Sequence, residues 1–106
     1  MYSNNNYIFF SNPKIFGINR YMLFKLNQDR LNYKFIYRKL FKIIMSNLLL
    51  KTKLKNTNNK LIAFCVENNC GVGYDEIDVY GKYLDEWSGE NLVGQILMEI
   101  RSHINR

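Results

Sequence analysis

The stretch Leu61-Ile62-Ala63-Phe64-Cys65-Val66 (LIAFCV, residues 61–66) is apolar at every position. A strand without a polar face is typical of a sheet that is covered on both sides. Turn-forming residues bracket this stretch, since residues 56–59 are mostly asparagine and residues 67–71 contain two asparagines and a glycine. We therefore expect residues 61–66 to form the central strand of a small sheet.

The segments on either side of the two turns predict two further strands. Upstream, Leu50, Thr52 and Leu54 alternate with lysines, as in a strand with one buried and one solvated face. Downstream, Ile77 and Val79 alternate with acidic residues in the segment 74–80. Short connections favour antiparallel neighbours. The sequence thus predicts a three-stranded antiparallel meander within residues 48–80.

Helical periodicity marks the segments before and after these strands. Residues 20–47 carry an apolar stripe and a basic stripe, which predicts one amphipathic cationic helix. The last helix is expected over residues 89–104, with Ser88 as its N-cap. Gly94 within it indicates either a small cost in helix stability or a close contact. The residues of its predicted core face are Leu92, Val93, Ile96, Leu97, Ile100 and Ile104.

The predicted fold class is therefore α+β, with the C-terminal helix packed on the sheet. Residues 20–106 are expected to form a single small domain. Residues 1–19 combine an asparagine run with Pro13 and Gly17 and show no sustained period, which predicts an extended basic and aromatic arm. Met45 opens a segment that could itself start a compact product, so the sequence leaves open whether residues 1–44 are translated.

Charge is strongly segregated along the chain. Residues 1–60 hold twelve Lys or Arg and one carboxylate, Asp29, whereas residues 61–106 hold three basic and eight acidic residues. The two parts therefore carry formal charges of +11 and −5, which sum to +6. Such segregation predicts an anionic partner for the first part.

RNA is the partner that this composition favours, because cations neutralise phosphates and rings stack on unpaired bases. The alternative interpretation is that the rings form core and the lysines a solvated face, and for any single residue the sequence favours that alternative. The predicted nucleic-acid-binding residues are Lys14, Arg20, Lys25, Arg30, Lys34, Arg38, Lys39 and Lys42, with Tyr33 or Tyr37 as stacking rings.

Two other functions fit the sequence. An accessory protein of a phage, plasmid or parasite could bind a basic partner protein through its acidic part. The residues of that surface would be Asp75, Glu76, Asp78, Asp85 and Glu86. Alternatively, the cationic amphipathic helix could lie on an anionic membrane surface.

The sequence shows no constellation that points to catalysis or to a cofactor. Cys65 and Cys70 lack further ligands for a zinc site and do not form a disulfide framework, which favours a reducing compartment. His103, the single histidine, has no evident serine or cysteine nucleophile to activate. In addition, no apolar run is long enough to span a bilayer. Abundant Asn, Lys and Ile beside one Ala and one Pro are typical of an AT-rich genome. We expect a non-catalytic RNA-binding or assembly subunit, for example in an organellar ribonucleoprotein, located in the cytoplasm or an organelle matrix.

Overall fold

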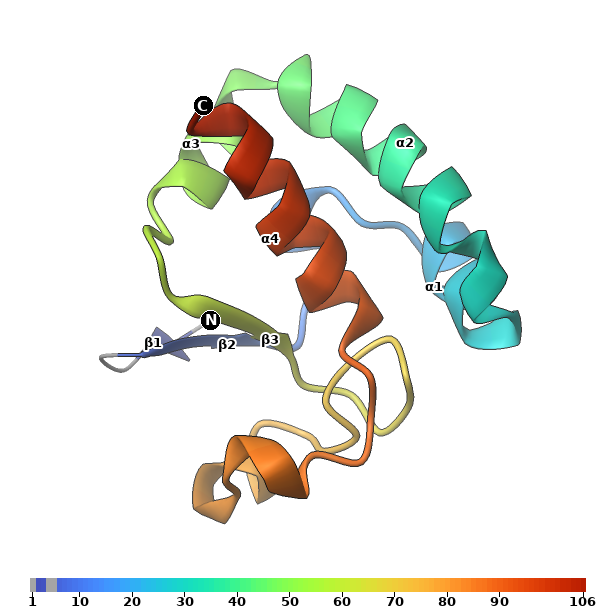
Figure 1. Cartoon of the computed structure of the whole chain (residues 1–106), viewed down its shortest axis with the longest axis vertical. Coiled ribbons are helices and arrows are strands. Elements are labelled where there is room, and N and C mark those ends of the chain that lie inside the picture. The colour runs from blue at the N-terminus through green and yellow to red at the C-terminus, as the bar shows by residue number, and fades with distance from the viewer. Residues whose placement is uncertain (1, 4–5) are drawn as a thin grey trace.

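A computed structural model describes residues 2–3 and 6–106 of the chain. The strands within these residues are β1 (Tyr2–Ser3), β2 (Tyr7–Phe10) and β3 (Leu61–Phe64), and the α-helices are α1 (Arg20–Gln28), α2 (Tyr33–Met45), α3 (Leu48–Lys55) and α4 (Leu92–Ile104). Short 3-10 helices are η1 (Pro13–Phe16), η2 (Arg30–Asn32), η3 (Asp78–Gly81) and η4 (Leu84–Glu86). Figure 1 shows their arrangement.

The sheet has the strand order β1-β2-β3, so the predicted meander is wrong. Strand β2 is central, and it pairs in parallel with β3 and antiparallel with β1. In the parallel pair Tyr7 lies opposite Leu61 and Phe10 lies opposite Phe64. Parallel neighbours need a long crossover connection, which η1 and the helices α1 to α3 provide. Strand β3, predicted to be central, is therefore at the edge among the described strands.

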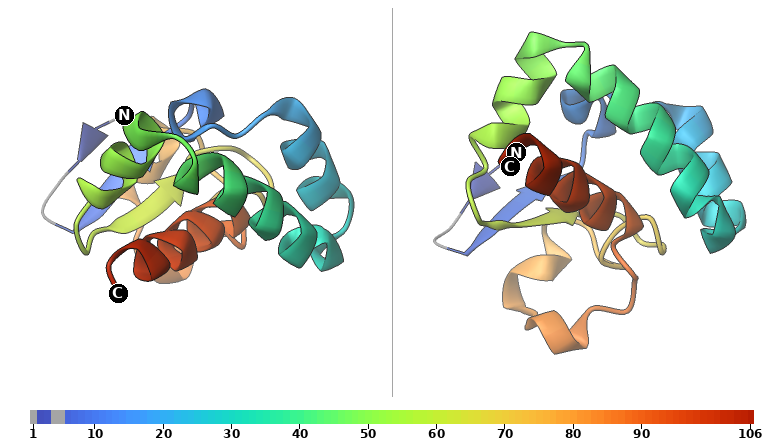
Figure 2. Two further views of the ribbon diagram at one scale, coloured as in Figure 1. Left: turned by 90° about the horizontal axis from the view of Figure 1, so that it is seen from above. Right: turned by 45° about the horizontal axis from the view of Figure 1, so that its top comes forward.

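Both faces of β3 are covered, which agrees with its lack of polar residues. Ile62 and Phe64 face the helices and join the main core, whereas Ala63 and Cys65 join a smaller core on the opposite face. Figures 1 and 2 show α2 and α4 on one side of the strands and the segment that contains η3 and η4 on the other. The molecule consequently has three layers: helices, sheet and an acidic loop segment.

The supposed N-terminal arm is part of the core. Phe10, Phe16 and Ile18 are buried, and the Phe10 ring stacks on Phe64 with 4.9 Å between ring centres. Pro13 and Gly17 begin and end η1 instead of interrupting a loose segment. A four-residue strand is too short to show a period, and for this reason the sequence pattern concealed β2. A chain beginning at Met45 would leave β3 without its partner strand.

Residues 48–55 are helical instead of extended. The Asn47 side chain accepts a hydrogen bond from the Leu50 backbone N–H at 3.2 Å and so caps α3. Leu50 and Leu54 stand four residues apart, a spacing that places both on one face of a helix as well as on one face of a strand. Leu54 is fully buried and Leu50 packs against the core. The alternation of Leu and Lys was therefore compatible with both periods.

The predicted third strand, residues 74–80, is a loop that leads into η3. The Asp75 carboxylate accepts a hydrogen bond from the Asp78 backbone N–H at 2.8 Å, which turns the chain. Val79 is buried whereas Ile77 is exposed, so these two residues do not share a face. The segment has no strand partner among the described residues, because the sheet ends at β3.

The predicted helix over 20–47 is divided into α1, η2 and α2. The Asp29 carboxylate accepts a hydrogen bond from the Leu31 backbone N–H at 2.8 Å, and this turn separates α1 from η2. The apolar stripe of α2 packs inward as expected, with Ile36, Leu40 and Ile44 buried. Leu48 follows Ile44 at the same helical spacing in the sequence, but it lies on α3 and is exposed.

Helix α4 packs on the sheet as expected, but it begins at Leu92 instead of Gly89. All residues of its predicted core face are buried except Ile104, which is partly buried. Its N-cap position is held by Asn91, at φ 53°, and not by Ser88. The Asn91 side-chain amide accepts a hydrogen bond from the Phe64 N–H at 3.0 Å and donates one to the Ile62 carbonyl at 2.9 Å. The Asn91 side chain thus provides hydrogen-bond partners for one backbone N–H and one backbone carbonyl of β3.

Close packing joins α4 to its neighbours at two more points. A Cβ at Gly94 would collide with the Ile62 carbonyl, so this glycine marks the close contact that the sequence offered as one alternative. Near the other end of α4, the buried Arg101 guanidinium donates to the Thr57 hydroxyl at 2.9 Å and the Lys60 carbonyl at 2.7 Å. Burial lowers the pKa of Arg101.

Candidate nucleic-acid interface

The candidate interface is built on the helical hairpin α1–η2–α2. The Asn19 carboxamide oxygen accepts a hydrogen bond from the Met22 N–H at 2.9 Å and starts α1. The Asn32 side chain donates to the Lys25 carbonyl at 2.8 Å and ties the turn to the end of α1. Met22 and Leu26 are buried against the core. These contacts hold the outer faces of α1 and α2 beside each other.

Three aromatic rings stand on those outer faces. Tyr21 is 48% exposed, Phe24 is 62% exposed and Phe35 is 46% exposed. Tyr21 and Phe24 are three residues apart and share one face of α1, whereas Phe35 comes from the first turns of α2. Large rings exposed together are the feature that calls for an explanation, because single exposed apolar residues are ordinary.

Two lysines lie over two of these rings, Tyr21 and Phe35. The Lys39 ammonium nitrogen lies 5.2 Å from the Tyr21 ring centre and 4.8 Å from the Phe35 ring centre, so it links the two helices. The Lys25 nitrogen lies 5.7 Å from the Tyr21 ring centre. Such distances allow cation–π attraction. We call the residues Tyr21, Phe24, Lys25, Phe35 and Lys39 the aromatic–lysine surface.

The remaining predicted cations are exposed around this surface. Lys34, Arg38 and Lys42 project from α2, while Lys14 and Arg20 line a shallow hollow at the start of α1. Arg30 is exposed too, but its guanidinium bonds the Glu90 carboxylate at 2.9 Å. The single acidic residue among positions 1–60, Asp29, is engaged in the turn hydrogen bond. The hairpin therefore presents positive charge with little compensation.

Tyr33 and Tyr37, the rings expected to stack on bases, point towards α4 instead. The Tyr33 hydroxyl donates to the Glu99 carboxylate at 2.9 Å, and burial together with Glu99 raises the pKa of Tyr33. The Tyr37 ring stacks on Phe41, with 5.9 Å between centres, and lies 6.3 Å from the His103 ring. Both tyrosines thus contribute to packing between α2 and α4.

Tyr21, Phe24 and Phe35 are interspersed among the cations of residues 1–60, and the sequence pattern singled out none of them. What distinguishes these rings is their position relative to the buried residues of their own helix, taken for α1 and α2 separately. Tyr21 and Phe24 lie on the face of α1 opposite Met22 and Leu26, and Phe35 directly precedes the buried Ile36. The exposed faces could have been predicted only if the end of α1 at Asp29 had been recognised, because the two helices then have independent buried faces.

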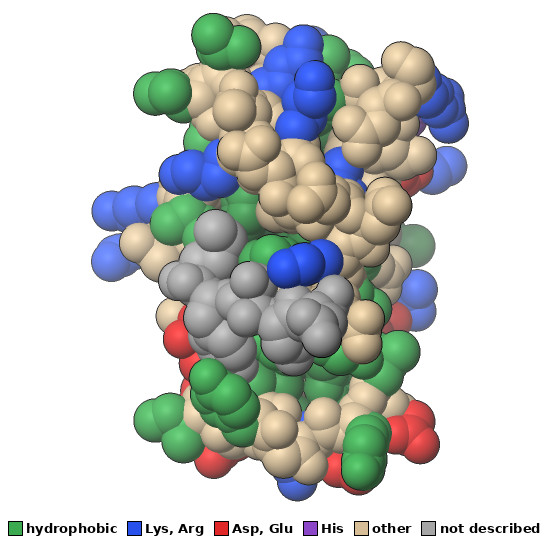
Figure 3. Space-filling model, turned by 90° about the vertical axis from the view of Figure 1, so that its left-hand side faces the viewer, with side chains coloured by type: hydrophobic (Ala, Val, Ile, Leu, Met, Phe, Trp, Pro, Cys, Tyr) green, Lys and Arg blue, Asp and Glu red, His purple; other side chains and the backbone are tan. Residues whose placement is uncertain are grey.

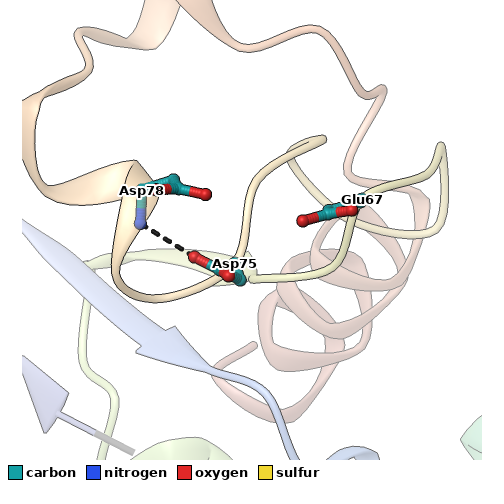
Figure 4. A group of neighbouring side chains, drawn as sticks. All are labelled: Glu67, Asp75 and Asp78. Carbon is teal, nitrogen blue, oxygen red and sulfur yellow. Dashed lines mark hydrogen bonds between the residues drawn. The ribbon is translucent and has the colours of Figure 1, made fainter.

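The acidic residues gather in the loop segment on the other side of the sheet. The carboxylates of Glu67, Asp75 and Asp78 offer oxygen atoms that all lie within 4.8 Å of one another. Figure 4 shows these three side chains turned towards a common space. Hard cations prefer such oxygen ligands, but exposed acidic groups are common without an ion, and Asp75 already caps the turn at Asp78. We assign no metal to this cluster. The remaining predicted acidic residues, Glu76, Asp85 and Glu86, lie in the same segment.

Charge is divided in space as it is along the chain. In Figure 3 the Lys and Arg side chains gather over the upper part of the face shown, and the Asp and Glu side chains lie towards the lower end. The two thiols add no reactive group at neutral pH, because burial raises the pKa of Cys65 to about 12 and that of Cys70 to about 11. A protonated thiol is a poor nucleophile and a poor metal ligand.

Comparison with models of known protein families, with curated proteins and with solved structures finds no match for this chain. Among the described residues, every helix is too short or too polar to cross a bilayer.

Proposed function

We propose that this chain is a non-catalytic RNA-binding subunit of a larger assembly, and that it binds unpaired RNA on the aromatic–lysine surface. The observation that carries the proposal is the position of Lys39 between the exposed rings of Tyr21 and Phe35. Rings provide a stacking platform for bases, and ammonium groups on flexible stems neutralise the phosphates beside them.

Unpaired RNA fits this surface better than a duplex. Bases in a duplex are stacked on each other, so a protein ring reaches their faces only where the strand is open. The rings of Tyr21 and Phe35 stand on two different helices, which suits successive bases of one strand. Lys34, Arg38 and Lys42 extend the positive charge along α2, where the backbone of that strand would run.

A membrane surface is the less favoured partner of the same region. An amphipathic helix at a membrane inserts its apolar face among the lipids. In α2 that face is occupied, because Ile36, Leu40 and Ile44 are each at most 1% exposed within the core. The apolar members of the aromatic–lysine surface are rings, Tyr21, Phe24 and Phe35, and that surface has no aliphatic side chain to insert among lipid tails.

The test is fluorescence anisotropy of a short labelled single-stranded RNA titrated with the full chain at several salt concentrations. Affinity should fall steeply between about 50 mM and about 200 mM salt, and removing one phosphate-binding lysine should reduce the salt slope by about 0.7. Tyr21→Ala and Phe35→Ala should each weaken binding by about 5-fold to 150-fold, which corresponds to about 1–3 kcal/mol per stacked base.

The chain offers matched controls at its acidic end. Lys82 also places its ammonium over a ring, 5.0 Å from the Tyr74 centre, so Lys82→Ala removes the same kind of contact far from the proposed site. Tyr83→Ala removes an exposed ring there. Lys39→Ala should weaken RNA binding and Lys82→Ala should not. Equal effects of both lysines, or binding to anionic lipid vesicles in preference to RNA, would contradict the proposal.

A further inference from the structure

The end of the molecule formed by the α2–α3 junction exposes aliphatic side chains. Leu48 is 77% exposed and Leu49 is 80% exposed, although both stand at the start of a helix whose Leu50 and Leu54 pack inward. Met45, the last residue of α2, is exposed beside them. The surrounding positions 34–60 contain eight Lys or Arg and no carboxylate. Lys51 and Lys53 follow Leu48 and Leu49 at helical spacing in α3. We call Met45, Leu48, Leu49, Lys51 and Lys53 the basic apolar end.

A second exposed apolar group occupies the loop segment with η3 and η4. Ile77 is 81% exposed and Tyr83 is 75% exposed, and Leu84 is also exposed. Positions 67–90 contain seven carboxylates and a single cation, Lys82. We call Ile77, Asp78, Tyr83, Leu84, Asp85 and Glu86 the acidic apolar end.

The acidic apolar end is held in place and does not fold inward. Val79 is 1% exposed and anchors η3 in the smaller core under the sheet. The Tyr74 hydroxyl donates to the Glu86 carbonyl at 3.3 Å and joins the two sides of the loop. With the loop fixed in this way, the neighbouring apolar side chains remain directed outward, where a partner could cover them.

The two ends lie at opposite extremes of the molecule. Figure 1 places the α2–α3 junction at the top of its longest axis and the segment with η3 and η4 at the bottom. The extent along that axis is 36 Å. One molecule therefore cannot bring its own basic and acidic apolar ends together. A second copy can place its acidic apolar end on the basic apolar end of the first, where the charges are opposite and both surfaces are apolar.

We propose that copies of this chain associate head to tail, with the acidic apolar end of one copy on the basic apolar end of the next. The surfaces differ, so the contact is heterologous and generates a ring or an open chain of copies rather than a two-fold dimer. Opposite charges give the contact its direction and registry. The aromatic–lysine surface is not part of the contact and stays accessible in each copy.

The experiment is sedimentation velocity of the purified full chain, freed of nucleic acid, over a series of concentrations and salt levels. At low salt the mean mass should rise with concentration above the monomer mass of 12.7 kDa. At high salt, where the Debye length shortens to a few ångströms, it should return towards 12.7 kDa.

Charge reversal at each end makes the test specific. The acidic-end variant D78K/D85K/E86K and the basic-end variant K51E/K53E should each associate more weakly alone than the native chain, because like charges then face each other at the reversed positions. An equimolar mixture of the two variants should associate again, since each supplies the surface that the other lacks. The control K25E/K39E changes charge on the aromatic–lysine surface and should leave association unchanged while it weakens RNA binding.

Leu48→Ser with Leu49→Ser should also reduce association, and it provides a second variant if charge reversal impairs folding. A mass that stays at 12.7 kDa under all conditions would overturn the inference. Association that neither charge reversal weakens, or a mixture that fails to restore association between folded variants, would overturn it as well. None of these outcomes bears on RNA binding, which the anisotropy test decides separately.

Discussion

Replacement of Asn91 by alanine should destabilise the fold more than a typical single substitution. The side-chain amide of Asn91 is buried and forms two hydrogen bonds with the edge strand β3, to the Phe64 N–H at 3.0 Å and the Ile62 carbonyl at 2.9 Å. Alanine leaves both backbone groups buried without a partner. Each unsatisfied group costs about 1–3 kcal/mol.

The backbone adds a second cost at the same position. Asn91 has a φ of 53°, in the left-handed region that asparagine tolerates and alanine does not. That conformation costs a residue with a Cβ about 1–2 kcal/mol. The total expected loss for Asn91→Ala is about 3–8 kcal/mol, a large part of the 5–15 kcal/mol that stabilises an ordinary domain.

Urea unfolding followed by circular dichroism measures this loss, and Asn91→Gly separates its two causes. Glycine removes the same hydrogen bonds but adopts a positive φ freely. It should therefore be about 1 kcal/mol more stable than the alanine variant and still well below the native chain. A loss under about 1 kcal/mol for Asn91→Ala would refute the reasoning, because the edge of β3 would then be satisfied in another way.

Two further predictions follow from buried contacts. Gly94→Ala should lower the midpoint of thermal unfolding, because a Cβ there meets the Ile62 carbonyl. The resulting strain of about 1–3 kcal/mol exceeds the gain in helix propensity. The control is Gly81→Ala, where a Cβ meets nothing within 4 Å, and it should change the midpoint little. The thiols of Cys65 and Cys70 should react with a thiol reagent at about pH 8 only as fast as the chain opens. Burial raises the pKa of Cys70 from 9.0 to about 11, so its contribution to stability is complete below pH 9 and is lost as the pH rises through that interval. The free energy of unfolding of the native chain should therefore fall relative to that of Cys70→Ala between pH 9 and pH 11, because the other titrating groups are common to both chains.

Elements whose own pattern is long and unambiguous were predictable. The stretch LIAFCV yields β3, covered on both faces, because six consecutive apolar residues cannot face water on either side. The apolar stripe of α4 recurs through the whole helix, and its members are buried or partly buried where the sequence placed them. Burial of the α2 stripe follows from the same helical period.

Elements defined by distant contacts were not predictable in this way. Strand β2 has four residues, and only its pairing with β3, more than fifty positions away, identifies it as a strand. In α3 the spacing of Leu50 and Leu54 fits a helix and a strand equally well, and the Asn47 cap together with the packing of α3 on the core decides between them. The acidic segment 74–80 alternates like a strand but has no neighbouring edge to bond.

The amino-acid sequence alone determined the division of charge along the chain and the number of apolar side chains, because both are sums over residues and do not depend on the fold. The fold selected which rings are buried and which stand outside: it turned Tyr33 and Tyr37 towards α4 and left Tyr21 and Phe35 beside Lys39. It also placed the basic and acidic segments at opposite ends of the molecule. The physical reason is that helix phase and strand pairing depend on contacts between residues far apart in the chain, and a local pattern does not record those contacts.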